Sequence, residues 1–266
     1  MTRVNSFALL TDFGTHDGYV GAVKAVIASL VPDAHFIDLC HEVAAQDVVH
    51  GAQLLQDLSP YLPRACVVLA VVDPGVGTAR RGIAVEWVGH QRWLVGPDNG
   101  LLWPSIAGKE VRIHSLENSE YRLPQVASTF HARDVFAPAA AHLALGIPVE
   151  RFGAEVTDPR VLELPQPVVS TRQIAGEILR ADHYGNLISS IPETLLPGDV
   201  PREQLRVQLG DVEIAGVVAS YGHRPVNNLL ATVGGFGRIE LAVHGGSAAQ
   251  RLGYRPDASY SLLVRW

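Results

Sequence analysis

The chain has 266 residues, of which 47% are hydrophobic and 18% are charged, and its formal net charge is −6. This composition excludes a disordered chain and is typical of a folded protein with one large or two modest domains. The lack of a basic cluster argues against nucleic acid as the main partner, and no apolar run reaches the roughly 18–20 residues of a membrane helix.

Residues 1–160 alternate between strand and helix patterns. Short apolar runs predict strands at Phe7–Leu10, His35–Leu39, Val67–Val72, Ile83–Glu86 and Arg92–Val95. Apolar residues at helical spacing, or an alanine-rich composition, predict helices at Gly18–Leu30, Asp47–Leu58 and Ala137–Leu145. Such alternation predicts an α/β N-terminal domain with a mostly parallel sheet.

The pattern changes after about Thr157. Asp158–Thr171 carries three prolines, and we expect a linker over residues 161–172. Residues 173–266 are expected to form a small all-β, barrel-like C-terminal domain, because turns rich in Gly, Pro and Asp separate one strand pattern from the next. The expected strands are Ile174–Arg180, Leu187–Ile191, Leu205–Leu209, Val212–Ala219, Arg238–Val243 and Tyr260–Trp266.

The two cysteines, Cys40 and Cys66, lie in or beside apolar runs. Such positions are typical of reduced, buried thiols, and two cysteines cannot form a metal or disulfide framework. The first residues enter a strand pattern without the features of a signal peptide. We therefore expect a cytoplasmic protein.

The segment VVDPGVGTARR, residues 71–81, is the most informative of the chain. Asp73 follows the apolar run Val67–Val72 on a turn of Pro and Gly, where open α/β sheets place their ligands. Arg80 comes seven positions later and is close enough to fold back against Asp73. Taken alone, the pair is equally consistent with an ordinary surface ion pair at a turn.

Two more segments of the first domain carry candidate polar groups. Asp12 ends the first expected strand, where a carboxylate could accept hydrogen bonds from a ribose diol or simply cap a turn. Asp17 is the expected N-cap of the first helix. His131 and Asp134 lie at the start of the alanine-rich helix. A dinucleotide-binding fingerprint and a Walker lysine are both missing from the sequence.

Other constellations are weaker. His41 and His50, with Asp38 and Asp47, match no compact metal-binding pattern, and we expect surface capping there rather than metal binding. No nucleophile elbow exists, so covalent catalysis has no support. The turn Asp182–Asn186 offers an amide that could bind a purine edge, although Gly-Asn chemistry alone also explains a hairpin turn.

Six segments together resemble the S-adenosylmethionine hydroxide adenosyltransferases, relatives of the fluorinase and chlorinase. They follow in order over nearly the whole chain and are LTDFGTHDGYVG, VVDPGVGTARR, PDNGLL, TFHARDVFAP, DHYGN and GFGRIELAVHGG. The resemblance implies an α/β domain followed by a β-barrel, and a homotrimer with active sites between subunits. It also implies conversion of S-adenosylmethionine and water to adenosine and L-methionine, with the sulfonium compound as substrate and with no cofactor or metal.

The resemblance assigns Asp73, Arg80 and His131 to a triad that handles water. The sulfonium makes the 5′ carbon electrophilic and methionine leaves as a neutral thioether, so the enzyme must orient water and remove its proton. Arg80 should favour the ionised form of Asp73, which makes this carboxylate a good orienting group but a weak base. His131, with an ordinary pKa of about 6.5, is the better proton acceptor on these grounds, but the sequence leaves the choice open. An anionic Asp73 should also repel halide.

The resemblance also assigns substrate-binding residues in both domains. They are Asp12, Asp182, Asn186, Gly235, Glu240 and Val243, the last two on a strand that borders adenosine. Asp12 would hold the ribose hydroxyls, Asn186 the adenine and Asp182 the methionine ammonium. Val243 would act through its backbone, and Gly235 stands where relatives usually have a serine, so it can offer only main-chain groups.

Two other functions remain open from the residues. A metal-dependent phosphoesterase could use Asp12, Asp17, His41 and Asp73, and would lose activity in chelator. A nucleoside-binding regulator could keep the pocket without turnover. Formation of adenosine and methionine from S-adenosylmethionine separates all three.

Overall fold

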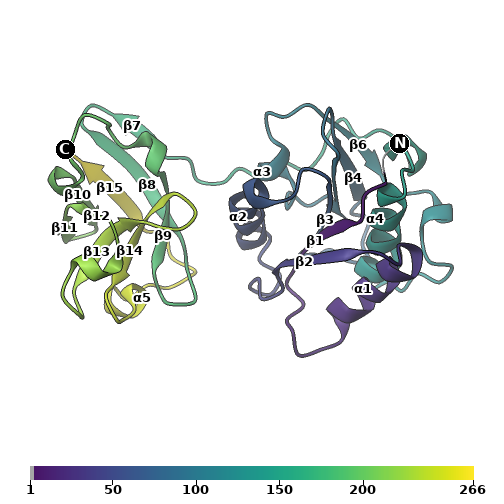
Figure 1. Ribbon diagram of the computed structural model, residues 1–266, viewed down its shortest axis with the longest axis horizontal. Helices are drawn as coiled ribbons and strands as arrows, with labels where there is room; N and C mark the ends of the chain where they lie inside the picture. The colour runs from purple at the N-terminus through teal and green to yellow at the C-terminus, as the bar shows by residue number, and fades with distance from the viewer. Residues whose placement is uncertain (1–2) are drawn as a thin grey trace. The chain divides into compact units, whose positions relative to one another are not determined.

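The computed structural model describes residues 3–266, which form two compact units that meet in sequence between Leu164 and Pro165 (Figure 1). Among the described residues, the first unit contains two hydrophobic clusters and the second contains one. Val168–Ser170, inside the expected linker, forms a short strand, β7, that pairs with the first long strand of the second unit. None of the helices in residues 3–266 has the length and apolar character needed to span a bilayer.

The first unit is built on a six-stranded sheet with the order β2-β1-β3-β5-β4-β6. Its strands are β1 (Ser6–Thr11), β2 (His35–Cys40), β3 (Cys66–Val71), β4 (Gly82–Trp87), β5 (Arg92–Pro97) and β6 (Val111–Ser115). β4 runs antiparallel to both of its neighbours, whereas β2, β1, β3 and β5 are parallel. The predicted mostly parallel sheet is therefore confirmed.

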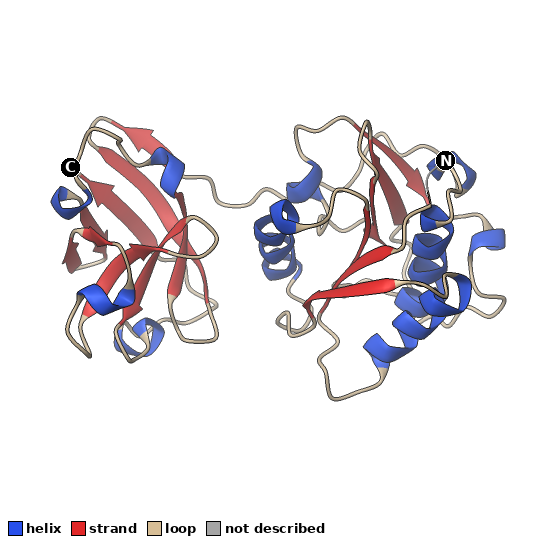
Figure 2. Ribbon diagram, in the orientation of Figure 1, coloured by secondary structure: helices blue, strands red, loops and turns tan. Residues whose placement is uncertain are grey.

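Helices cover both faces of this sheet (Figure 2). The helices are α1 (Tyr19–Leu30), α2 (Val48–Leu58), α3 (Trp103–Ile106) and α4 (Ala137–Ala144), with the π-helical turn η3 (Ala132–Phe136) leading into α4. Residues of α1, η3 and α4 share one core cluster, and residues of α2 and α3 share the other. All six residues of β3 are buried because both of its faces contact a core.

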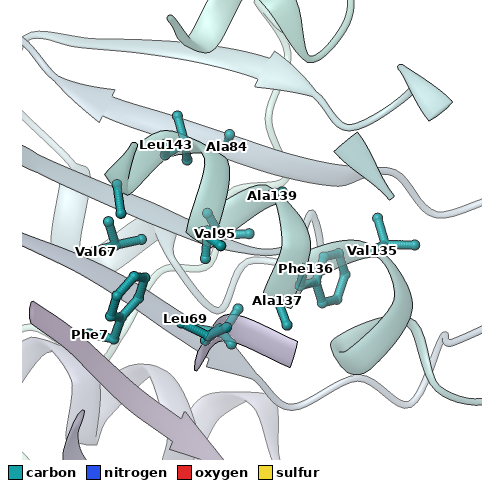
Figure 3. Packing of buried hydrophobic residues seen from close by; sticks show 14 of the residues in the cluster. Phe7, Val67, Leu69, Ala84, Val95, Val135, Phe136, Ala137, Ala139 and Leu143 are labelled. Atoms are coloured by element: carbon teal, nitrogen blue, oxygen red, sulfur yellow. The ribbon is translucent and has the colours of Figure 1, made fainter. Parts of the chain in front are cut away.

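Figure 3 shows the cluster that fixes the start of α4. Phe136 and Ala137 belong to the same cluster as Val67 and Leu69 of β3 and Phe7 of β1. Phe136 is fully buried. Burial of a phenylalanine side chain contributes about 1.5–3 kcal/mol, so this residue anchors the turn that follows His131.

Two capping expectations have different outcomes. The N-cap of α1 is Gly18, which makes no side-chain capping bond, so the expectation for Asp17 is wrong. For α2 the expectation is confirmed, because the Asp47 carboxylate accepts a hydrogen bond of 2.9 Å from the backbone N–H of His50. Asp17 lies outside the first turn because the helix begins at Tyr19.

The second unit is a nearly closed, barrel-like sheet with the order β11-β10-β15-β8-β9-β14-β13-β12. Its remaining strands are β8 (Gln173–Ala181), β9 (Leu187–Pro192), β10 (Arg206–Leu209), β11 (Val212–Ala215), β12 (Val217–Val218), β13 (Leu229–Val233), β14 (Arg238–Val243) and β15 (Ser261–Arg265). The expected strand Val212–Ala219 is divided at Gly216 into β11 and β12. One short helix, α5 (Ala248–Arg251), follows β14.

Short 3-10 turns connect elements in both units. They are η1 (Ser59–Tyr61), η2 (Ser119–Tyr121), η4 (Val149–Arg151), η5 (Glu193–Leu195), η6 (Arg202–Gln204) and η7 (Tyr221–His223).

Candidate active site

Asp73 and Arg80 form a bidentate ion pair at the carboxyl end of β3. Arg80 Nε donates to Asp73 Oδ1 at 2.9 Å, and Arg80 Nη2 donates to Asp73 Oδ2. The side chains are only 5% and 12% exposed for Asp73 and Arg80, respectively. The pair is therefore not the ordinary surface ion pair that the sequence left open, and its fork geometry orients the carboxylate.

The turn after Asp73 is tight because of its glycines. The backbone N–H of Val76 donates to the carbonyl of Asp73 at 3.2 Å. Gly77 has a φ of +77°, and a Cβ there would lie 2.5 Å from the carbonyl oxygen of Ser128. Only glycine allows this turn to lie against the segment that leads to His131.

His131 completes the cluster from a third segment of the chain. It is the N-cap of η3, and its Nδ1 lies 3.1 Å from Arg80 Nη2. A guanidinium only donates, so Nδ1 accepts and the neutral ring carries its proton on Nε2. The guanidinium carbon of Arg80 also lies 5.1 Å from the centre of the Phe136 ring. Asp73, Arg80 and His131 are thus brought together as the sequence predicts.

The surroundings of His131 disfavour its charged form. Burial lowers the pKa of the imidazole, and the positive charge of Arg80 lowers it further, against the opposing effect of Asp73. Arg122, which lies outside the six segments, adds a further lowering effect. His131 is therefore neutral over a wider pH range than an isolated histidine.

Asp12 lies at the same edge of the sheet as Asp73. β1 pairs with β3 in parallel, with Thr11 opposite Val71, so both strands end there. Asp12 Oδ2 accepts a hydrogen bond of 2.8 Å from the backbone N–H of Gln46. The carboxylate thus holds a neighbouring loop, and its binding of ribose stays a prediction.

His41 differs from the expected surface cap. Its side chain is 6% exposed; Nδ1 lies 2.8 Å from Thr11 Oγ1 and Nε2 lies 3.0 Å from Asp38 Oδ1. It therefore links the end of β1 to β2 in a partly buried network, in which the Asp38 side chain is 48% exposed. Within residues 3–266, no three His, Cys, Asp or Glu side chains come together as a metal site would require.

In the second unit, Asp182 and Asn186 stabilise one turn. Asp182 Oδ1 accepts from the backbone N–H groups of Tyr184 and Asn186 at 2.9 and 2.8 Å. Asp182 Oδ2 accepts from Asn186 Nδ2 at 3.0 Å. The side chain of Asn186 is thereby held in one orientation at the start of β9, which the hairpin interpretation alone does not require.

Glu240 is a buried carboxylate of β14. It is 4% exposed, and Tyr221 Oη donates to its Oε1 at 2.6 Å. Burial raises the pKa of Glu240; the Tyr221 hydrogen bond offsets part of this effect, and the nearby charge of Asp182 adds to it. The same contact raises the pKa of Tyr221. The sequence does not point to Tyr221, since a Tyr-Gly turn carries no signal of a carboxylate partner.

Gly235 and Val243 lie at opposite ends of β14. Gly235 is exposed in the turn before the strand, and Val243 is buried at its end, opposite Leu229 of β13. A Cβ at Gly234 would lie 2.0 Å from Glu240 Oε2, so the carboxylate packs directly against the turn that carries Gly235. Both residues keep main-chain groups as their only polar contribution, as expected.

Comparison with known proteins identifies the family. The N-terminal domain of the SAM hydroxide adenosyltransferases matches residues 7–153, and their C-terminal domain matches residues 176–261. The chain belongs to this family. The resemblance drawn from the six segments is thereby confirmed.

Several known proteins resemble the chain over nearly its full length. The (R)-S-adenosyl-L-methionine hydrolase of Salinispora tropica is 42% identical over 92% of this chain and 93% of its own. That of Thermus thermophilus is 42% identical over 96% and 98%. The crystal structure of an uncharacterized conserved protein from Thermotoga maritima has a TM-score of 0.88 at 34% identity, covering 98% of this chain and 100% of its own.

Proposed function

We propose that this chain hydrolyses S-adenosyl-L-methionine to adenosine and L-methionine by in-line attack of water on the 5′ carbon. The observation that carries the proposal is the buried cluster of Asp73, Arg80 and His131, in a chain of the SAM hydroxide adenosyltransferase family. Relatives at 42% identity are named for this hydrolysis.

The reaction needs a placed nucleophile more than it needs an acid. As the bond from the water oxygen to the 5′ carbon forms, the bond from that carbon to sulfur breaks, and methionine leaves with a neutral thioether. Holding water and carbon in line at near-contact distance supplies about 7–11 kcal/mol of the barrier. The water must also lose a proton, and a positioned base contributes about 10²–10⁴-fold.

The hydrogen bonds of the triad favour Asp73 as the group that orients this water and receives its proton. Each Asp73 oxygen accepts one hydrogen bond from Arg80 and keeps lone pairs for another donor. His131 Nδ1 already accepts from Arg80, and Nε2 carries the proton of the neutral ring. Protonation of His131 would therefore replace its hydrogen bond to Arg80 by repulsion.

The remaining site residues are proposed as substrate contacts. Asp12 holds the ribose hydroxyls, Asn186 the adenine edge and Asp182 the methionine ammonium. Gly235 and Val243 contribute main-chain groups beside adenosine. Glu240, whose carboxylate is bonded to Tyr221 and packed against Gly234, contributes by holding the turn that carries Gly235.

The division of labour between the parts of the chain belongs to the same proposal. Residues 1–160 carry the triad, 161–172 link the domains, and 173–266 complete the site for adenosine and methionine. The site is completed between subunits of a closed homotrimer, which a heterologous interface can form. S-adenosyl-L-methionine is the substrate, and no cofactor takes part. Light scattering tests the assembly, since an active monomer would contradict it.

The deciding experiment is incubation with S-adenosyl-L-methionine in water enriched in ¹⁸O. Attack on the 5′ carbon places one ¹⁸O atom in the 5′ hydroxyl of adenosine and none in methionine, as mass spectrometry measures. Binding without turnover would favour a nucleoside-binding regulator. Activity lost in chelator would favour a metal-dependent enzyme.

A further inference from the structure

A pocket of about 250 Å³ lies beside the triad in the first unit. Its lining includes Arg80 and His131 from the triad, together with Glu117 and Arg122. Arg81 also lines the pocket but is paired with Asp98 and Asp158, so Arg122 is the third arginine of the lining.

Arg122 is held in place from one side only. Its Nη2 donates to the backbone carbonyl of Leu116, and its Nε is buried without a hydrogen-bond partner among the described residues. A buried N–H without a partner is costly, so the hydrogen bonds of this guanidinium do not by themselves account for its place beside the pocket.

The charges around His131 are unequally compensated. Asp73 is paired with Arg80, and Asp134 is paired with Arg133, whose Nε and Nη2 lie 2.6 and 2.9 Å from its oxygens. Arg122 has no carboxylate partner among residues 3–266. Its positive charge therefore acts on the imidazole without a paired anion of its own.

We propose that Arg122 is a positioning residue of the triad, which acts together with burial and Arg80 to keep His131 a neutral acceptor for the hydrogen bond from Arg80. In the imidazolium, Nδ1 carries a proton and cannot accept from a guanidinium. Loss of that bond frees Arg80 Nη2, which also holds Asp73 Oδ2. Arg122 thus preserves the orientation of Asp73 as the pH falls. Its effect on turnover rests on the proposed hydrolysis.

The test compares R122Q with R122K. R122Q removes the charge, so His131 should titrate at higher pH, and the acid limb of the turnover profile should move the same way. Turnover at alkaline pH and KM should change little. R122K keeps the charge and should retain the acid limb of the wild type. R112Q is the control, because it removes an arginine from β6, half exposed and outside the pocket.

NMR titration of the His131 imidazole, assigned with H131A, reads the effect without turnover. An unchanged His131 titration in R122Q, with turnover reduced equally at every pH, would overturn the proposal. If R122Q does not fold, R122M replaces it, since methionine keeps much of the aliphatic stem. Failure of the wild type to form adenosine would contradict the proposed hydrolysis alone, because the titration still decides the role of Arg122.

Discussion

Asp73 in the first unit and Glu240 in the second are both buried carboxylates, but their neighbours differ. Asp73 meets a guanidinium that donates to both of its oxygens. Glu240 meets the neutral hydroxyl of Tyr221 and lies near a second carboxylate, Asp182, so its pKa is raised. A compensated charge suits a group that orients a nucleophile, whereas an uncompensated one suits a group that supports a turn.

The largest expected effect on turnover comes from substitution of Asp73. D73N keeps the shape of the side chain but removes the charge beside Arg80, and should lower turnover by about 10²–10⁴-fold while substrate affinity stays within a few-fold. Single-turnover kinetics and calorimetry measure the two quantities. D158N is the matched control, because Asp158 pairs with an arginine but is 80% exposed. Weak binding with normal saturated turnover would move Asp73 from the nucleophile to the substrate contacts.

Substitution of Asp12 should lower substrate affinity before it lowers turnover, the reverse of the result expected for Asp73. D12A removes a charge-assisted hydrogen bond to the ribose, worth about 1.5–3 kcal/mol, so affinity should fall by roughly 10–150-fold before turnover is affected. Calorimetric titration with S-adenosylmethionine measures the loss. D33A serves as control, since Asp33 is half exposed and pairs with Arg3. Equal affinity of D12A and wild type would remove Asp12 from the ribose site.

Substitution of Gly77 tests whether the close approach of its turn to Ser128 is needed to form the triad. G77A places a Cβ 2.5 Å from the carbonyl oxygen of Ser128, whereas G14A, at a similar positive φ, meets no atom within 4 Å. Both variants strain the backbone, but the contact with Ser128 should lower the free energy of unfolding of G77A by about a further 1–3 kcal/mol relative to G14A. Denaturant unfolding compares them. Equal stabilities would show that the turn can withdraw from Ser128.

Glu240 should have the smallest effect, and it concerns stability. Because its pKa is raised by folding, the folded protein binds more protons than the unfolded chain above the ordinary value of 4.5, and the free energy of unfolding falls as pH rises through that range. E240Q removes this dependence and should narrow the difference in stability between pH 5 and pH 8. E213Q, at an exposed glutamate of the same unit, should not. If E240Q and the wild type differ equally in stability between pH 5 and pH 8, the pH dependence comes from groups other than Glu240.

Sequence patterns located most of the fold because local burial dictated them. β3 is a continuous apolar run with all six residues buried, and its place before Asp73 follows from periodicity alone. β6 is absent from the expected strands, although Val111–His114 alternates apolar and polar side chains as a half-buried strand does. β13 is absent as well, and β7 lies within the expected linker because Pro165 and Pro167 directly precede it.

The sequence by itself determined the chemical identity of the candidate site, since the six segments name the family and the residue types of the triad. The tertiary structure decided how those residues meet. Arg80 and His131 are 51 positions apart, and only the close approach at Gly77 brings the guanidinium to Nδ1. The partners of Glu240 and the place of Arg122 beside His131 were likewise beyond the sequence, because burial and electrostatic compensation depend on neighbours that are distant along the chain.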